Sequence, residues 1–154
     1  MTQPIRIEID LPLTSAEAFS VYAERIGDWW PAAFTSSGDD LDSVAIESWA
    51  GGHVYERSRD GATYQWGVVR SYEAGVELVH SFHLAQDEQH PTEVSVRFTD
   101  EGGCRMHFEH RGWTAHNQHA RDKFASEGGW ATVLGAFAAR ARNSRHGGAD
   151  GLGL

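Results

Sequence analysis

Histidines in apolar, strand-like segments are the residues of this sequence best suited to chemistry. His80 stands in an alternating run and shares its face with Val76, Leu78, Phe82 and Leu84. A titratable ring among apolar neighbours must find a hydrogen-bond partner or carry the cost of burial. We interpret His80 as a hydrogen-bonding or acid–base group in a cavity wall. The alternatives are a satisfied core histidine and a strand face that is turned outward.

His110 is a second candidate of the same kind. It follows Met106 and Phe108 on one strand face and precedes Trp113 at the entry to the last helix. Its imidazole could contact a ligand in a cavity. Alternatively, it could fasten the turn that leads into the helix.

Aromatic side chains are unusually numerous, with six Trp, seven Phe and four Tyr. Aromatic rings bury a large area at a small entropic cost, and Tyr and Trp add a polar tip. They could line a pocket for a flat apolar ligand, although an aromatic core is the simpler interpretation for most of them. Besides the two histidines, the candidate lining residues are Trp30, Tyr55, Trp66, Phe82, Phe108, Trp113, Trp130 and Leu134.

One predicted strand could add a charge to this pocket. Arg57 shares a strand face with His53 and Tyr55, whereas Glu56 lies on the opposite face. If the first face points inward, Arg57 could pair with a ligand carboxylate. If it points outward, Arg57 is an ordinary solvated charge. Alternation alone leaves the orientation of Arg57 and Glu56 open.

Metal and nucleophile chemistry is not expected from this sequence. His107 and His110 are three residues apart on a strand, so they point to opposite faces and cannot share an ion. The same holds for His80 and His83. The single cysteine, Cys104, has apolar neighbours and can form no intrachain disulfide. We therefore predict no metal site and no cofactor, since no phosphate-binding loop is present either.

Length and charge restrict the possible partners. The chain has 154 residues, which is enough for one domain with a real core. Its formal net charge of −9 disfavours nucleic acid and anionic membranes as partners. No segment resembles a secretion signal or is apolar for long enough to cross a bilayer. We therefore expect a cytoplasmic protein.

The predicted elements begin with a strand, a helix and six further strands. Residues 5–11 alternate strictly between apolar and charged side chains, which predicts a strand with one wet face. The capping-box spacing from Thr14 to Glu17 predicts a helix start. A polar loop is predicted at 35–43. Strand-like runs with short turns then favour an antiparallel meander, at 44–49, 53–59, 62–72, 76–84, 92–98 and 104–110.

A long C-terminal helix completes the predicted order. Apolar residues at helical spacing run from Trp130 to Ala141. Beside them lies a second stripe, made largely of small residues: Phe124, Gly128, Ala131, Gly135 and Ala138. The helix starts near Asn117 or only after Glu127, and we favour the longer version, although Gly128-Gly129 lowers the local helix propensity. We place one domain at residues 1–142 and a flexible tail at 143–154.

Several motifs resemble those of a known protein family. In chain order they are Trp29-Trp30-Pro31, Gly51-Gly52-His53-Val54-Tyr55-Glu56, Asp60-Gly61, Trp66-Gly67-Val68-Val69, Thr92-Glu93-Val94-Ser95-Val96, His110-Arg111-Gly112-Trp113 and Gly129-Trp130. With the order of elements, they resemble the START-like (SRPBCC) superfamily and its bacterial branch similar to activators of the Hsp90 ATPase. The resemblance implies an α+β helix-grip fold, in which a curved seven-stranded antiparallel sheet wraps around the C-terminal helix and leaves an apolar cavity. It implies no single chemistry.

Three functions are compatible with these features. We favour binding of a small hydrophobic molecule between the sheet and the C-terminal helix, because aromatic residues and small helix residues leave space there. The first alternative is an enzyme of the cyclase or hydratase kind, with His80 or Arg57 acting in the cavity. The second is a protein-interaction role, with a chaperone or a second copy of the chain as partner.

Overall fold

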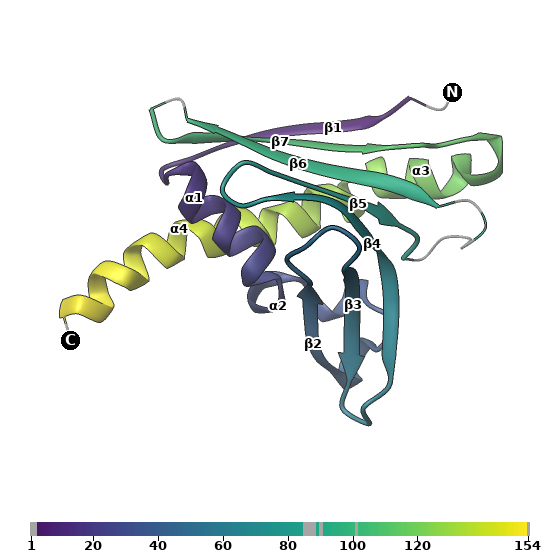
Figure 1. Cartoon of the computed structure of the whole chain (residues 1–154), viewed down its shortest axis with the longest axis horizontal. Helices are drawn as coiled ribbons and strands as arrows, with labels where there is room; N and C mark the ends of the chain where they lie inside the picture. Colours follow the sequence, from purple (N-terminus) through teal and green to yellow (C-terminus); the bar gives the residue numbers. More distant parts are fainter. Residues whose placement is uncertain (1–2, 85–88, 90, 101, 154) are drawn as a thin grey trace.

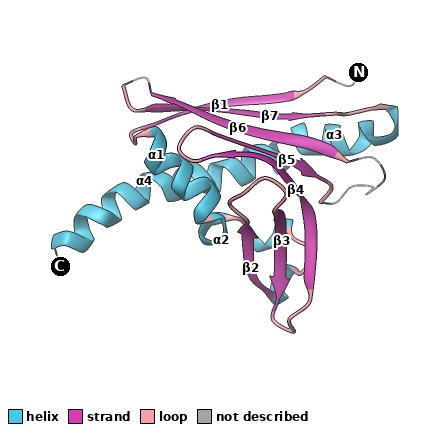
Figure 2. Cartoon of the chain, viewed as in Figure 1, coloured by secondary structure: helices cyan, strands magenta, loops and turns pink. Residues whose placement is uncertain are grey.

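One antiparallel sheet of seven strands organises the part of the chain that the structure describes (Figure 1, Figure 2). The computed structural model describes residues 3–84, 89, 91–100 and 102–153, with side chains up to residue 143. The sheet order is β1-β7-β6-β5-β4-β3-β2, so β2 to β7 form a meander and β1 pairs with β7. The strands are β1 (Ile5–Leu11), β2 (Leu41–Ile46), β3 (His53–Ser58), β4 (Thr63–Glu73), β5 (Glu77–Phe82), β6 (Thr92–Asp100) and β7 (Cys104–Arg111).

Helices connect β1 to β2 and follow β7. The first group comprises α1 (Ser15–Phe19), a π-helical turn (Ser20–Glu24) and α2 (Ile26–Trp29), with short 3-10 turns at 32–34 and 38–40 before β2. The second group comprises a 3-10 turn at 115–117, α3 (Gln118–Ala125), a π-helical turn (Glu127–Ala131) and α4 (Thr132–Gly153). The predicted capping box is present at the start of α1, where Thr14 Oγ1 accepts from the Glu17 N–H at 3.1 Å.

The sheet bends at β4, because the two halves of this strand pair with different neighbours. Its first half pairs with β3 and its second half with β5. In Figure 1, β2, β3 and the lower half of β4 form a lobe that turns away from the direction of β1, β6 and β7. Gly67 lies at the bend, where a Cβ atom would stand 1.7 Å from the carbonyl oxygen of Ser81. Only glycine permits this approach, which curls the sheet.

The inner face of the curled sheet carries the core. Cys104, Met106, Phe108 and His110 of β7 are buried, and the residues between them are partly exposed, as the alternating sequence predicts. α4 contacts α2 and β1 and continues past the sheet towards the C-terminus (Figure 1). This arrangement confirms the predicted helix-grip fold, in which a curved seven-stranded antiparallel sheet holds a C-terminal helix.

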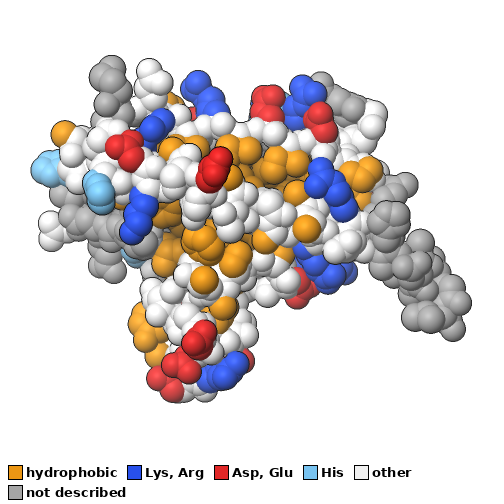
Figure 3. All heavy atoms as spheres, turned by 180° about the vertical axis from the view of Figure 1, so that it is seen from behind, with side chains coloured by type: hydrophobic (Ala, Val, Ile, Leu, Met, Phe, Trp, Pro, Cys, Tyr) orange, Lys and Arg blue, Asp and Glu red, His pale blue; other side chains and the backbone are white. Residues whose placement is uncertain are grey.

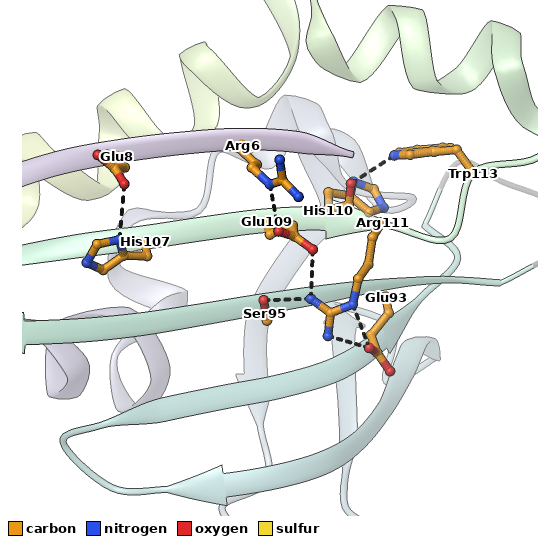
Figure 4. Close-up of polar contacts among 9 residues, drawn as sticks. All are labelled: Arg6, Glu8, Glu93, Ser95, His107, Glu109, His110, Arg111 and Trp113. Atoms are coloured by element: carbon orange, nitrogen blue, oxygen red, sulfur yellow. Dashed lines mark hydrogen bonds and ion pairs between the residues drawn. The ribbon is translucent and has the colours of Figure 1, made fainter. Parts of the chain in front are cut away.

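The outer face of the sheet carries ion pairs instead (Figure 4). Arg111 of β7 donates to Glu93 of β6 at 3.0 Å and to Glu109 at 3.2 Å. Arg6 of β1 donates to the other side of Glu109 at 2.9 Å. Exposed pairs of this kind each contribute about 0–1 kcal/mol to stability. The outer face therefore keeps the strands wettable and contributes little to the stability of the fold.

The surface seen from behind mixes apolar and charged side chains (Figure 3). Hydrophobic side chains gather across the middle of this view, and charged side chains surround them and mark the tip of the β2–β4 lobe. Over the whole surface, the exposed large hydrophobic residues include Trp49, Tyr64 and Val76. Among the described residues, no helix is both long and apolar enough to span a membrane.

The chain after β7 is interrupted before α4, so the favoured helix start near Asn117 is wrong, and the alternative start after Glu127 fits the structure. α3 ends at Ala125, Ser126 is extended, and Gly129 has non-helical angles of φ −103° and ψ −123°. A Cβ atom on Gly129 would stand 2.3 Å from the carbonyl oxygen of Phe124. The segment Gly128-Gly129, which has a low helix propensity, forms a kink in the structure. Only glycine fits the close approach to the Phe124 carbonyl oxygen.

Other element boundaries differ from the prediction as well, most clearly at β2 and α4. β2 begins at Leu41, inside the segment that the sequence predicts to be a loop. α4 continues to Gly153, beyond residue 142. The domain boundary at residue 142 and the flexibility of the segment 143–154 stay predictions.

Candidate functional site

A pocket of about 450 Å³ lies between the segment after α2, helix α3 and the start of α4. Small-molecule sites typically have volumes of roughly 300–1,000 Å³ and mostly apolar walls. This lining is apolar except for two hydroxyl residues and one lysine. It consists of Trp30, Ala33, Phe34, Thr35, Ser36, Leu84, Ala120, Lys123, Phe124, Gly128, Gly129, Trp130 and Val133.

Aromatic rings in fixed orientations form much of the wall. The rings of Phe124 and Trp130 are nearly parallel, with centroids 5.7 Å apart. Trp30 stands edge-on to Trp130 at 5.9 Å, and its indole N–H donates to the Phe34 carbonyl oxygen at 3.1 Å. Rings held in this way present their faces to a flat ligand at a small entropic cost.

A buried carboxylate holds the loop side of the pocket. Glu56 accepts hydrogen bonds from the backbone N–H groups of Ser36 at 2.8 Å and Ser37 at 2.7 Å, and from the Trp66 indole at 2.8 Å. Burial raises the pKa of Glu56, but these hydrogen bonds outweigh it and leave the pKa below its ordinary value. Trp66 packs against Trp30, with ring centroids 4.8 Å apart. The charged carboxylate therefore positions both Ser36 and Trp30 on the wall.

His110 fastens the kink between α3 and α4 to the sheet. The Trp130 indole N–H donates to Nδ1 of His110 at 2.8 Å, so the ring proton lies on Nε2. Nε2 then donates to Thr92 Oγ1 at 2.6 Å, and the Thr92 hydroxyl donates to the Phe82 carbonyl oxygen at 2.8 Å. Burial, helped by the nearby His80, lowers the pKa of His110 to about 3. The ring is therefore neutral with both nitrogens engaged, as the structural interpretation expects.

His80 is buried on β5 and is also neutral. Its Nδ1 donates to the carbonyl oxygen of Ser81 at 2.8 Å. Burial lowers the pKa of His80 to about 4, although this hydrogen bond and Glu93 act in the opposite direction. His80 is not among the described residues that line the pocket. An acid–base role for His80 in this pocket therefore has no geometric support.

Lys123 supplies the charge of the pocket. It lies in the last turn of α3 and is the one charged side chain among the described lining residues. Within the described ranges, no group of three or more His, Cys, Asp or Glu side chains could hold a metal ion. The chemistry that this site offers is therefore apolar and aromatic contact beside a single cation.

The sequence itself matches a protein family over most of its length. A family model described as "Activator of Hsp90 ATPase homolog 1-like protein" matches residues 17–142. The chain belongs to this family. The matched region of this AHSA1-like chain includes every residue that lines the pocket. A search of curated proteins finds no match to the sequence.

Solved structures resemble this AHSA1-like chain across nearly its whole length. Protein NE0264 from Nitrosomonas europaea has a TM-score of 0.69 at 10% identity, with 93% of this chain and 96% of that chain covered. Protein Ms6760 from Mycobacterium smegmatis has a TM-score of 0.62 at 13% identity, with 95% and 92% covered. The anthrahydroquino-gamma-pyrone synthase Txn09 has a TM-score of 0.61 at 22% identity, with 88% and 94% covered. These likenesses show the fold.

Of the predicted lining residues, Trp30 and Trp130 line the pocket. Most of the others are buried in the core: Trp66, His80, Phe82, Phe108, His110, Trp113 and Leu134. Several of these residues support the pocket indirectly, without lining it. Trp113, for example, donates from its indole to the His110 carbonyl oxygen at 3.0 Å (Figure 4). Which residues touch a ligand stays a prediction.

Arg57 and Tyr55 are not among the described residues that line the pocket. Arg57 is exposed and Tyr55 only half-buried, whereas Val54 and Glu56 are buried. The inward face of β3 is therefore the one that carries Glu56. Neither face of this strand is wholly apolar, so the alternating pattern contained no signal for its orientation.

Sequence reasoning missed Lys123 and the loop side of the pocket. Phe124 belongs to the predicted small-residue stripe, which indicated space beside the C-terminal helix. Ser36 lies in a segment that reads only as a polar loop. Its place on the wall depends on Glu56, which is 20 residues away in the sequence, and no local pattern indicates such a contact.

Proposed function

We propose that this protein binds a small, mostly apolar molecule in the pocket between the segment after α2, α3 and the start of α4. The observation that carries this proposal is a hollow of about 450 Å³ beside a row of aromatic rings. Small-molecule sites are typically clefts of this size with mostly apolar walls and a few polar groups. The family supports the proposal, because AHSA1-like and SRPBCC domains commonly bind hydrophobic ligands.

The walls are already ordered before a ligand arrives. Trp30 packs against Trp66, which Glu56 holds, and Trp130 donates to His110. Ordering of side chains on binding weakens affinity, and this cost is small where the bound arrangement already exists. Rigid aromatic walls therefore favour a flat, rigid ligand over a flexible chain.

Binding of the neutral fluorophore N-phenyl-1-naphthylamine to the full chain tests the proposal. We expect its fluorescence to rise on binding and the fluorescence of Trp30 and Trp130 to be quenched. Ala120→Trp, which fills the pocket, should abolish the signal. Ala139→Trp adds the same ring to an exposed position of α4 outside the lining and should leave it intact. No binding to the wild type, or equal binding to both variants, would contradict the proposal.

The other two functions rest on resemblance alone. Lys123 is the one titratable side chain among the described lining residues, and Arg57 lies outside. The cyclase or hydratase hypothesis relies on His80 or Arg57, and neither is among the described residues that line this pocket. The description of the family suggests a chaperone partner. No specific observation suggests a homodimer. Both stay predictions.

A further inference from the structure

Lys123 is the only lysine of this chain, whose other twelve basic residues are arginines. It shares the lining with Ala120 and Phe124 of the same helix. Residues at i, i+3 and i+4 lie on one helix face, so Lys123 belongs to the face of α3 that bounds the pocket. The chain thus places its one lysine beside the aromatic wall.

The ammonium group of Lys123 is available to a ligand. It forms no ion pair with any carboxylate of the described residues, and the nearest acidic neighbour in the sequence is engaged elsewhere. Asp122 accepts from Gln118 at 2.9 Å and pairs with Arg121 at 3.5 Å. The local acidic group therefore leaves the charge of Lys123 unneutralised.

The other charge near the pocket is hidden from it. Glu56 lies behind the segment that contains Ser36 and Ser37, and three N–H donors satisfy its carboxylate. The N–H dipoles that point at this carboxylate offset part of its negative potential. Lys123 is the one charged group that the described lining presents to a ligand.

We propose that the pocket selects planar aromatic carboxylates, with the ring against Phe124 and Trp130 and the carboxylate paired with Lys123. This inference rests on the proposed function, because it names the ligand class of the same pocket. The net charge of −9 disfavours anions at long range. That repulsion is screened beyond about 8 Å at physiological ionic strength. The nearest cation therefore determines whether the pocket attracts an anionic ligand. A carboxylate and an ammonium in a partly enclosed site form a charge-assisted hydrogen bond.

A matched pair of ligands tests the inference on the full chain. Naphthalene-2-carboxylate and naphthalene-2-carboxamide have the same ring and nearly the same size, and differ in charge. We expect the wild type to bind the carboxylate about tenfold more tightly by calorimetry, the order expected for a hydrogen bond between charged groups. Raising the salt concentration should weaken binding of the carboxylate but not binding of the carboxamide.

Substitutions at Lys123 assign this preference to one side chain. Lys123→Met keeps the length of the side chain and should remove the tenfold preference, while Lys123→Arg should retain most of it. Arg57→Met removes the same charge from the exposed side of β3 and should leave the preference unchanged. The control separates a local contact from an effect of net charge.

The unique lysine allows an independent measurement. Acetylation with an amine-selective reagent can modify only Lys123 and the α-amino group of this chain, and mass spectrometry distinguishes the two. Naphthalene-2-carboxylate should slow acetylation of Lys123 relative to the α-amino group, and the carboxamide should slow it less.

Failure of the inference and failure of the proposed function are distinguishable. If both naphthalenes bind the wild type equally well and Ala120→Trp excludes both, the proposed function stands and the inference is overturned. A preference for the carboxylate that survives in Lys123→Met also overturns the inference. If neither naphthalene nor the neutral fluorophore binds, the proposed function itself fails.

Discussion

The two halves of the interior are built on different principles. Beneath α1, α2 and the middle of α4, ring centroids lie 5.1–6.4 Å apart in a closely packed cluster of Phe19, Tyr22, Trp29, Phe98 and Phe137. At the other end, rings such as Phe108 and Trp130 pack as closely, with centroids 4.6 Å apart, but some of the rings border an open pocket, and polar groups hold them. Glu56 binds Trp66 and the loop, and His110 binds Trp130.

This difference shows what keeps a hollow open inside a small domain. In the packed half, each ring touches other rings, and dispersion holds most of them in place, with one buried hydrogen bond from the Trp29 indole to the Val21 carbonyl oxygen at 2.8 Å. A ring beside a void lacks such neighbours on one side, so close packing favours its collapse into the space. Hydrogen bonds are directional, and a buried one that is broken costs much more than it contributes when intact. Buried polar groups therefore hold the walls of the hollow half in place. We call these groups, Glu56 and His110, its struts.

The largest expected effect on stability comes from removing a ring from the packed half. Phe137→Ala should lower the free energy of unfolding by about 4 kcal/mol, the cost of an aromatic cavity, as measured by urea denaturation. The folded protein should still bind N-phenyl-1-naphthylamine with nearly unchanged affinity. Phe137→Leu serves as the milder variant if the alanine variant does not fold. A loss of affinity equal to that of Ala120→Trp would show that the halves are not independent.

A smaller effect on stability, but a larger one on the pocket, is expected from Glu56→Gln. The amide would turn an N–H₂ group towards donors that need an acceptor, which should lower the free energy of unfolding by about 2 kcal/mol. Because Ser36 and Trp30 lose their support, affinity for the fluorophore should fall as well. Glu109→Gln on the outer face is the control and should cost less than about 1 kcal/mol without any change in affinity. Unchanged affinity in Glu56→Gln would contradict the role of Glu56 as a strut.

The sequence predicts the packed half better than the hollow one, for a physical reason. Alternation on β6 places Val96 and Phe98 inward, because a strand with one apolar face has one stable orientation. β3 carries charged residues on both faces, so the inward position of Glu56 could not be predicted. The pocket depends on long-range contacts of that kind, between a strand and a loop or between Trp130 and His110. Such contacts leave no periodic trace in the sequence.

The struts also make the hollow half the acid-sensitive part of the molecule. The pKa of His110 is about 3 in the folded protein against an ordinary value of 6.5, because the ring is buried and lies near His80. The folded state therefore takes up this proton less readily than the unfolded state. The contribution of His110 to stability is complete above about pH 6.5 and is lost as the pH falls towards about 3. His80, with a pKa of about 4, acts in the same direction.

The expected loss at about pH 5 is about 2 kcal/mol for each of these histidines, relative to neutral pH. Glu56, whose pKa is lowered, loses its contribution only at more acidic pH, so the interval between about pH 7 and pH 5 isolates the histidines. His110→Gln keeps an acceptor for Trp130 and a donor for Thr92 but does not titrate. Its stability should therefore fall by about 2 kcal/mol less over this interval, measured by urea denaturation at each pH. Ser95→Ala, on the outer face, removes no titratable group and should keep the full response of the wild type. If His110→Gln loses as much stability as the wild type, the acid sensitivity lies outside the struts, and the contrast between the two halves does not extend to pH.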